Sequence, residues 1–347
     1  MSNTVSISIT EVHRLSSGIL EAVGVPADHA VIVADSIVHA HRKGKGTHGL
    51  TRLPIYVRKI RDGLMAADTP ITVVRDTPVV SVIDANHGFG QVAGVKAMEI
   101  AVRKAGEFGV GVVGVRKSNN FGVAGFIVEA AISQGMIGLV LANSGPAIAP
   151  TGGSTPLLGT NPLAIGFPPG ESGIPIILDM ATSAAARGKI RLAARNGESI
   201  PLGWALDKDG NPTTDSKAAL EGTMLPLGGP KGYGLSLAID ILAGLLTGAA
   251  FAGDVKGLND PSDFSNYGHL IAAIHIEHFT TPADFREGIT LLESRIRECG
   301  PPDAVFMPGE KSYHTAQSLV NSVEVKASVL DEIRILAKVL GLPFEKA

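Results

Sequence analysis

The sequence is poor in cysteine, in aromatic residues and in charge. Its 347 residues include a single cysteine, Cys299, and aromatic side chains make up only 5%. One cysteine excludes an intramolecular disulfide and suits a reducing compartment. Charged residues make up 18% and the formal net charge is −3, so no strong field draws the protein to nucleic acid or to an anionic membrane. We therefore expect neither as a partner.

Targeting and membrane-spanning segments are also lacking. The first ten residues, MSNTVSISIT, contain no basic cluster and no apolar core, so no signal peptide is expected. The most apolar long stretch, residues 235–251, is interrupted by Asp240 and by glycines, which favours a buried helix over a membrane span. We expect a cytoplasmic protein.

Glycine is abundant, with 42 residues, and hydrophobic residues make up 45%. This composition is typical of a globular protein with a large core and many tight turns. Apolar residues at helical spacing predict amphipathic helices, and short apolar runs between turn signals predict strands. Helices are expected at residues 9–23, 27–41, 48–62, 91–108, 124–134, 183–194, 233–247, 283–296 and 326–341, and strands at 71–74, 79–83, 110–115, 137–142, 163–167, 175–178 and 269–276. The first 65 residues thus form a small helical layer, on which the last helix is expected to pack.

Several familiar motifs are absent or out of context. Residues 109–114 match G-x-G-x-x-G, but a helix precedes them and they lie in an apolar strand-like run, unlike a dinucleotide fingerprint. No P-loop motif occurs. Ser236 lies in a helical segment that lacks the last glycine of a hydrolase nucleophile elbow, so we interpret it as a core serine. The histidines lack metal-binding spacing, and no metal is expected.

The stretch GKGTHGLTRLPIY, residues 44–56, carries the most chemistry. After a Gly/Lys run that breaks the preceding helix, His48, Arg52 and Tyr56 follow at i, i+4 and i+8, which would place them on one helix face. Pro54 is tolerated in the first turns of such a helix. A histidine can exchange a proton near neutral pH, and an arginine fork suits a carboxylate. The pattern predicts a site that holds an acid and exchanges a proton beside it; a solvated basic helix face with a capping histidine is the alternative.

Turns that carry a cation or a hydroxyl recur farther along the chain. Residues 179–183 end an apolar strand and open a helix that runs to Arg187 and Lys189, so the helix N-terminus can receive an anion. Lys231 lies within GGPKGYG, where glycines would let a ligand approach the backbone. The long loop at residues 143–161 is of a kind that is often functional. Each turn could be an ordinary one, but together they favour a phosphate-bearing ligand such as a dinucleotide.

Eight segments in a fixed order carry a family resemblance. They are THGLTRLPIY (47–56), LGTNP (158–162), LDMATS (178–183), RGKI (187–190), PLGWALD (201–207), LPLGGPKGYG (225–234), LTGA (246–249) and MPGE (307–310). Nearly the whole chain thereby resembles the malate/L-lactate dehydrogenase family of NAD(P)-dependent oxidoreductases, which lack the usual Rossmann fold. That family also includes ureidoglycolate, sulfolactate, diketogulonate and Δ1-piperideine-2-carboxylate dehydrogenases or reductases.

The resemblance implies an α/β (α+β) fold of two parts. Residues 76–310 are expected to form a non-Rossmann NAD(P)-binding and catalytic domain with a mixed, largely antiparallel sheet. Residues 1–75 and 311–347 are expected to form a discontinuous helical domain for substrate binding and dimerisation. A homodimer with sites near the subunit interface is also implied.

The implied chemistry is hydride transfer between NAD or NADP and C2 of a small 2-oxo or 2-imino acid. The resemblance makes His48 the proton donor and acceptor, adds Thr47 and Lys189 as catalytic residues, and assigns the substrate carboxylate to Arg52. The substrate pocket is expected to include Thr160, Arg187 and Gly188. Cofactor contacts are expected from Asn120, Phe121, Gly122, Val123, Ala124, Asp179, Met180, Ala181, Pro230, Lys231, Met307, Pro308, Gly309, Glu310 and Lys311.

Three departures from the family pattern bear on this chemistry. Many members have serine where Thr47 stands, and threonine keeps the hydroxyl. Many carry a His-His pair where this chain has Asn119 and Asn120, which cannot titrate, so the choice between NAD and NADP stays open. Cyclic-imine reductases have an acidic residue where Lys189 stands, whereas lysine matches the malate- and lactate-like members. A 2-hydroxy/2-oxo acid is therefore preferred, and a cyclic imino acid is the alternative. A non-catalytic nucleotide-binding protein is a further alternative, against which the intact histidine–arginine pair argues.

Overall fold

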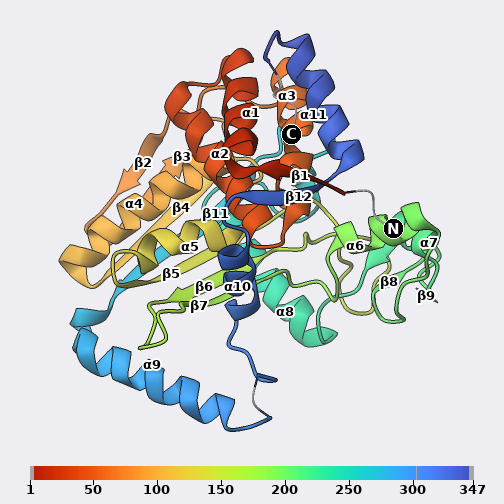
Figure 1. Ribbon diagram of the computed structural model, residues 1–347. Coiled ribbons are helices and arrows are strands. Elements are labelled where there is room, and N and C mark those ends of the chain that lie inside the picture. Colours follow the sequence, from red (N-terminus) through yellow and green to blue (C-terminus); the bar gives the residue numbers. More distant parts are fainter. Residues whose placement is uncertain (1–3, 302, 344–347) are drawn as a thin grey trace.

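The computed structural model describes residues 4–301 and 303–343 (Figure 1). Its centre is a seven-stranded sheet with the strand order β2-β3-β4-β11-β5-β6-β7. Strands β3 and β4 pair in parallel, and the other neighbours pair antiparallel. The strands are β2 (Thr72–Asp76), β3 (Val80–Asp84), β4 (Val110–Ser118), β5 (Met136–Ala142), β6 (Leu163–Phe167), β7 (Ile176–Met180) and β11 (Tyr267–His275). The predicted mixed, largely antiparallel sheet is thus confirmed.

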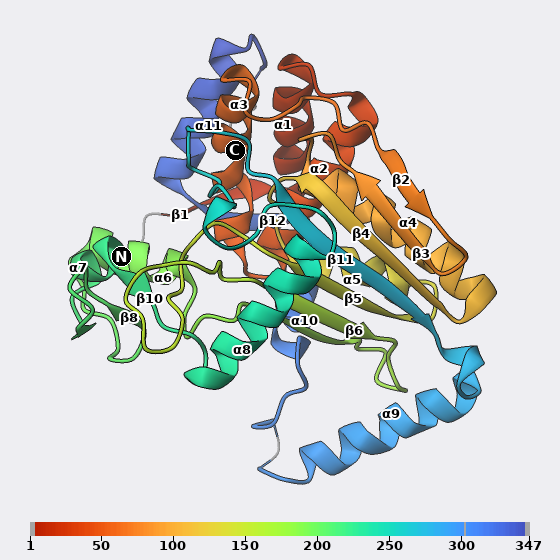
Figure 2. The same cartoon turned by 180° about the vertical axis from the view of Figure 1, so that it is seen from behind.

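Helices cover both faces of this sheet (Figure 2). They are α4 (Gly90–Phe108), α5 (Ala124–Ile132), α8 (Pro230–Ile239) and the π-helical turn η3 (Asp240–Leu245). Val140 of β5 joins the core beneath α4 and α5, whereas the next residue, Leu141, packs against Ile239 and Ala243 in α8 and η3. Consecutive side chains of a strand point to opposite faces of the sheet. Both faces of β5 are buried, which explains why its residues are apolar throughout.

The glycines of residues 109–114 allow a helix to lie close to the sheet. Gly109 ends α4 in the left-handed conformation, with a φ of 83°. Gly111 lies in β4, where a Cβ would come within 2.1 Å of the carbonyl oxygen of Ala101 in α4. This segment is a strand, as predicted, so its G-x-G-x-x-G match is not a dinucleotide fingerprint.

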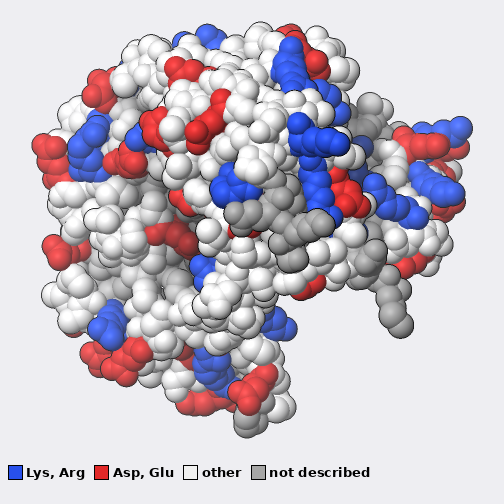
Figure 3. Space-filling model, turned by 45° about the horizontal axis from the view of Figure 1, so that its top comes forward, with Lys and Arg blue, Asp and Glu red and all other residues white. Residues whose placement is uncertain are grey.

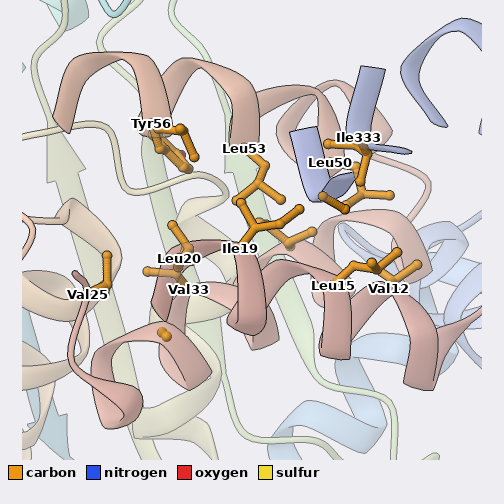
Figure 4. Packing of buried hydrophobic residues seen from close by; sticks show 14 of the residues in the cluster. Val12, Leu15, Ile19, Leu20, Val25, Val33, Leu50, Leu53, Tyr56 and Ile333 are labelled. Carbon is orange, nitrogen blue, oxygen red and sulfur yellow. The ribbon is translucent and has the colours of Figure 1, made fainter. Parts of the chain in front are cut away.

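The two ends of the described chain meet in a separate helical layer at the top of Figure 1. Strands β1 (Thr4–Ser8) and β12 (Ser322–Lys326) pair antiparallel. The helices of this layer are α1 (Ile9–Ala22), α2 (Ala27–Arg42), α3 (Leu53–Arg61) and α11 (Ala327–Val339). Ile333 of α11 lies among Leu15 and Ile19 of α1 and Leu53 of α3 (Figure 4). The last helix therefore packs on the N-terminal helices, as predicted.

The remaining elements lie around the sheet and its loops. A small three-stranded sheet has the order β10-β8-β9. Its strands and the neighbouring helices are β8 (Ala205–Leu206), β9 (Pro212–Thr213), β10 (Thr223–Met224), α6 (Arg187–Asn196) and α7 (Ser216–Glu221). The other helical elements are α9 (Pro282–Arg297), α10 (Glu310–Ser318), η1 (Gly46–His48), η2 (Leu50–Arg52), η4 (Ala252–Asp254) and η5 (Ile276–His278).

Some predicted boundaries are wrong for identifiable reasons. The helix expected from residue 183 begins at Arg187, because Ser183 forms a bridge with Pro226 and the Ala184 amide donates to the Leu225 carbonyl. The helix expected over residues 233–247 begins at Pro230, which suits the first turn of a helix, and ends in the π-helical turn. Seven elements do not correspond to any predicted helix or strand: β1, β8, β9, β10, β12, α7 and α10.

The division of the chain into two domains stays a prediction. The expected boundary at residue 75 falls within β2, which pairs with β3 in the large sheet.

Among the described residues, no helix is long and apolar enough to cross a membrane. Lys and Arg side chains are interspersed with Asp and Glu on the face that Figure 3 presents.

Replacing Ile333 by Ala should lower the free energy of unfolding by about 2–5 kcal/mol, because the fully buried side chain would leave a cavity between α11 and the N-terminal helices. Ile335→Ala is the matched control: Ile335 lies on the same helix but is 66% exposed, and its loss should change stability by less than about 0.5 kcal/mol. Urea unfolding followed by circular dichroism measures both. Equal losses would contradict the described packing of α11.

Candidate active site

His48 and Arg52 lie on a pair of tight turns that precede α3. The helix predicted over residues 48–62 is wrong at its start: η1 ends at His48, Gly49 is not helical, with a φ of −92° and a ψ of −135°, and η2 leads into α3 at Leu53. Pro54 occupies the first turn of α3, where its missing N–H has no cost. His48 and Arg52 nevertheless lie close enough for the Arg52 charge to lower the pKa of His48.

His41 of α2 supports these turns from behind. Its Nε2 accepts a hydrogen bond of 3.0 Å from the Leu50 amide. Burial lowers the pKa of His41 to about 4, so the ring is neutral at ordinary pH and can act as this acceptor. Gly49 is packed against the ring, because a Cβ there would lie 2.3 Å from it. The position of the turn that carries His48 therefore depends on His41 and Gly49.

His48 is half-buried and electrostatically held in its neutral form. Burial is the largest cause that lowers its pKa to about 4, the Arg52 guanidinium is the next, and the Lys45 ammonium adds to them. The carboxylate of Asp179 acts in the opposite direction. The Thr47 hydroxyl lies 3.1 Å from His48 Nδ1 and can orient the ring. A neutral imidazole at pH 7 is the form that accepts a proton.

Asp179 joins three parts of the chain at this site. It lies in β7, and its Oδ2 accepts a hydrogen bond of 2.5 Å from Lys45 Nζ and one of 3.2 Å from the Gly125 amide in the first turn of α5. Asp179 was expected as a cofactor residue, and the structure brings it close to His48. Lys45 was not among the predicted site residues: it belongs to the Gly/Lys run that we interpreted only as a helix break. A cation three residues before His48 was the available signal.

Arg52 is a cation without a partner among the residues that the structure describes. Its Nε is buried and has no hydrogen-bond acceptor there. Burial is the largest influence on Tyr56 and Tyr267: it raises the pKa of both hydroxyls, that of Tyr267 to about 12. The positive charge of Arg52 acts in the opposite direction on both. Two neutral tyrosines thus share the surroundings of an unpaired guanidinium. A buried donor without an acceptor has a free-energy cost that a bound carboxylate would relieve.

Of the other expected substrate residues, Gly188 contacts the turn that carries His48. Gly188 lies at the start of α6, and a Cβ there would be 3.5 Å from the Thr47 side chain. Arg187 precedes it and is half-buried, with a pKa lowered by burial and by Arg191, whereas Lys189 is exposed. Thr160 is held in the long loop, since its carbonyl accepts from the amide and the hydroxyl of Thr182 at 2.9 and 3.0 Å.

Expected cofactor segments gather around β7. In residues 120–124, the Asn120 Oδ1 accepts from the Tyr56 hydroxyl at 3.1 Å and from the Gly122 amide at 3.1 Å, which fixes the turn that begins α5. The segment 307–311 lies along β7, because the Ile177 amide donates to the Pro308 carbonyl at 2.9 Å. The carboxylate of Glu310 is hydrogen-bonded to this segment and to Arg297 of α9.

Glu310 thus has a visible structural role. Its carboxylate accepts a hydrogen bond of 2.7 Å from the Met307 amide and one of 2.8 Å from Arg297 Nη2. Gly309 beside it has a φ of 88°, and a Cβ there would lie 2.8 Å from the Ile177 carbonyl oxygen, so the loop can lie this close to β7 only with glycine.

Pro230 and Lys231 are exposed at the start of α8. The loop before them contacts Thr182, because the Leu227 amide donates to the Thr182 carbonyl at 2.8 Å.

The family described as malate/L-lactate dehydrogenase matches residues 7–334. The chain belongs to the malate/L-lactate dehydrogenase family, a family of oxidoreductases.

Relatives of this family member cover almost all of its length. It is 43% identical over 340 residues to the L-sulfolactate dehydrogenase of Methanothermobacter thermautotrophicus, which covers 98% of both chains. It is 37% identical over 345 residues to the Delta(1)-pyrroline-2-carboxylate reductase of Ancylobacter novellus, with 97% of this chain and 98% of that protein covered. The solved sulfolactate dehydrogenase from Methanocaldococcus jannaschii has a TM-score of 0.92 and 39% identity, with 98% of both chains covered.

The residues of this malate/L-lactate dehydrogenase family member fit a dinucleotide. A Cβ at Gly228 or Gly229 would meet nothing within 4 Å, so a ligand can approach the backbone there. Helix α8 begins directly afterwards without a side-chain cap, which leaves its first amides free to bind a phosphate beside Lys231. The Asp179 Oδ1 has no described partner and can accept a hydrogen bond from a ligand.

The motifs that we set aside have structural explanations in this family member. Ser236 is buried in α8, and its hydroxyl donates to the Gly159 carbonyl at 3.3 Å, so it is a core serine as predicted. Within residues 4–301 and 303–343, no group of three or more His, Cys, Asp or Glu side chains could hold a metal ion.

Replacing Gly49 by Ala should lower turnover about tenfold or more and also lower the melting temperature, because the new Cβ would displace the His41 ring and with it the His48 turn. Gly288→Ala in α9 is the control, since a Cβ there meets open space. Steady-state rates and thermal unfolding measure both variants. If Gly49→Ala matched Gly288→Ala in rate and stability, His41 would not be the support of this turn.

Proposed function

We propose that the protein is an NAD(P)-dependent oxidoreductase that interconverts a small 2-hydroxy acid and its 2-oxo acid, of the malate or L-lactate kind. One observation carries this proposal: the unpaired Arg52 guanidinium lies beside His48, a histidine held in its neutral form. Oxidation of a 2-hydroxy acid requires a cation that binds its carboxylate and, beside it, a group that accepts the hydroxyl proton.

Arg52 binds the substrate carboxylate through its planar fork, which places the 2-hydroxyl beside His48. In oxidation, neutral His48 accepts the hydroxyl proton; in reduction, protonated His48 returns it to the carbonyl oxygen. A nicotinamide nucleotide, when bound, would supply the hydride acceptor for C2 in oxidation and the hydride donor in reduction. Thr47 keeps the His48 ring oriented. When the carboxylate neutralises Arg52, one cause of the low pKa of His48 is removed, which raises that pKa and makes the protonated form more available for reduction.

The surrounding segments supply the pocket and the nucleotide site. Thr160, Arg187 and Gly188 would line the substrate side, where Gly188 lies against Thr47; Lys189 is exposed. Residues 120–124, 179–181, 230–231 and 307–311 would hold NAD or NADP. Lys231 and the N-terminus of α8 would offer charge and free amides to its phosphates.

Similarity to a reductase of a cyclic imino acid supports a second candidate. The relative from Ancylobacter novellus is named a Delta(1)-pyrroline-2-carboxylate reductase and is 37% identical to this chain. Arg52 and His48 could hold the carboxylate and protonate the ring nitrogen in the same geometry. A linear 2-oxo acid stays our first proposal, because Lys189 matches the malate- and lactate-like members of the family.

A turnover panel tests the proposal. Purified protein is mixed with NADH or NADPH and with pyruvate, oxaloacetate, 3-sulfopyruvate, Δ1-pyrroline-2-carboxylate or Δ1-piperideine-2-carboxylate, and nicotinamide absorbance is followed. Oxidation of the nucleotide by a linear 2-oxo acid is the expected result, and the faster nucleotide identifies the cofactor. Turnover of the cyclic imines alone would establish the second candidate, and no turnover of any acid would contradict both.

Two variants connect the panel to the proposed residues. His48→Gln should lower kcat by about 10²–10⁴ while nucleotide binding persists, because only proton transfer is lost. Arg52→Lys should mainly raise KM for the acid, because a point charge cannot replace the fork. Arg58→Lys on the exposed side of α3 is the control and should leave both constants unchanged. Unchanged turnover in His48→Gln would remove this histidine from the chemistry.

We also propose that two copies form a homodimer through α8 and η3. Exposed apolar side chains follow this segment and its flanks: Leu227, Leu235, Leu237, Ile241, Leu245, Leu246 and Phe251. Monomers seldom expose a contiguous apolar surface of this kind, and twofold dimers are the commonest oligomers. Lys231 is exposed at the start of the same helix, so a second copy would complete the surroundings of a cofactor residue. The expectation that residues 1–75 and 311–347 take part in dimerisation stays a prediction.

Sedimentation tests the dimer. The wild-type protein should sediment at twice its chain mass of 35.8 kDa, and Leu246→Asp should shift it towards the monomer, because a carboxylate cannot be buried unpaired in an apolar contact. Ile335→Asp is the control, since Ile335 and Leu246 are both 66% exposed but lie on different elements. A monomeric wild-type protein, or equal effects of the two variants, would contradict this interface.

A further inference from the structure

Lys45 has two contacts that together connect His48 to the nucleotide segments. Its carbonyl oxygen accepts the His48 amide at 2.8 Å, and its own amide donates to the Ala40 carbonyl at 2.7 Å, so its backbone is part of the His48 turn and is fixed to α2. Its side-chain ammonium reaches the Asp179 carboxylate in β7 at 2.5 Å.

This ion pair differs from an ordinary surface pair. The Asp179 side chain is 13% exposed and that of Lys45 is 33% exposed. The same carboxylate oxygen also accepts the Gly125 amide from α5, which restricts its orientation and leaves the other oxygen to a ligand. Exposed pairs contribute about 0–1 kcal/mol and tolerate many geometries, whereas a partly buried carboxylate with two donors has a defined position.

We propose that Lys45 is a positioning residue for the proton transfer: its backbone holds the His48 turn, and its ammonium anchors that turn to Asp179 on the strand that carries the nucleotide segment. This inference rests on the proposed function of His48. It gives Lys45 a role that acts through another residue, since no contact of its ammonium with the substrate is required. Lys45 thereby adds to the support that His41 gives this turn and connects the turn directly to β7.

The charges around His48 give Lys45 a second effect. Arg52 on η2 and Lys45 are the cations that lower the pKa of His48, and Asp179 on β7 is the anion that raises it. From α6, Gly188 lies against Thr47, and its neighbours Arg187 and Lys189 are not among the charges that shift the pKa of His48.

Loss of Lys45 would leave Asp179 as an uncompensated anion facing His48. An anion favours the imidazolium form, so the pKa of His48 would rise. Oxidation of the 2-hydroxy acid requires neutral His48. The acidic limb of the pH profile of kcat/KM for oxidation would therefore move to higher pH.

The test compares Lys45→Met, Lys45→Gln and Lys45→Arg with the wild-type protein. The dependence of kcat/KM on pH is measured for 2-hydroxy acid oxidation with saturating nucleotide. Lys45→Met and Lys45→Gln should lower kcat about tenfold or more and move the acidic limb up by about one pH unit. Lys45→Arg keeps the charge and should restore most of the rate and the wild-type limb. Lys338→Met, an exposed site on α11, is the control.

Two results would overturn this role. One is an unchanged kcat and limb in both neutral variants; the other is a lower kcat with an unmoved limb that Lys45→Arg fails to restore. If Lys45→Met does not fold, as judged by circular dichroism, the polar Lys45→Gln carries the test. His48→Gln is measured in parallel. Full turnover in His48→Gln would mean that the proposed function is wrong, whereas an inactive His48→Gln beside a normal Lys45→Gln would refute only the role of Lys45.

Discussion

The unpaired guanidinium of Arg52 is the constraint around which the candidate site is organised. A cation with a buried Nε and no described acceptor is costly in a folded protein, because desolvation is not balanced by a hydrogen bond. Its neighbours remain uncharged: burial keeps Tyr56 and Tyr267 protonated and is the largest cause that keeps His48 neutral. Binding of an anionic acid would change this balance, because the carboxylate supplies the missing acceptor and offsets the Arg52 charge, the second cause that lowers the pKa of His48.

The fold brings distant segments to this guanidinium without a Rossmann arrangement. The largely antiparallel sheet places Asp179 at the end of β7, and the loop 307–311 lies along that strand. The helical layer supplies His48 and Arg52 from turns supported by His41. The site therefore lies where the helical layer meets the sheet, and Lys45 and Asp179 form a direct contact between them.

Much of the fold was predictable because local patterns decide it. Val12, Leu15 and Ile19 recur at helical spacing and are buried in α1, and the apolar run of β5 matches its burial on both faces. Short elements were not predictable in this way. The strands β8, β9 and β10 have two residues each and exist only through pairing with one another. The turn at Gly49 was also missed, because the i, i+4 spacing of His48 and Arg52 fits a helix equally well.

The sequence by itself determined the class of fold, the family and the residue types of the candidate site, because the family segments occur in a fixed order and helical and strand periodicities are local. Only the tertiary structure decided which charges face one another. Lys45 and Asp179 are 134 positions apart and Tyr56 and Asn120 are 64 apart, and no local pattern encodes such pairs. Burial likewise exists only in the folded chain, and it is burial that lowers the pKa of His48 and leaves Arg52 without a partner among the described residues.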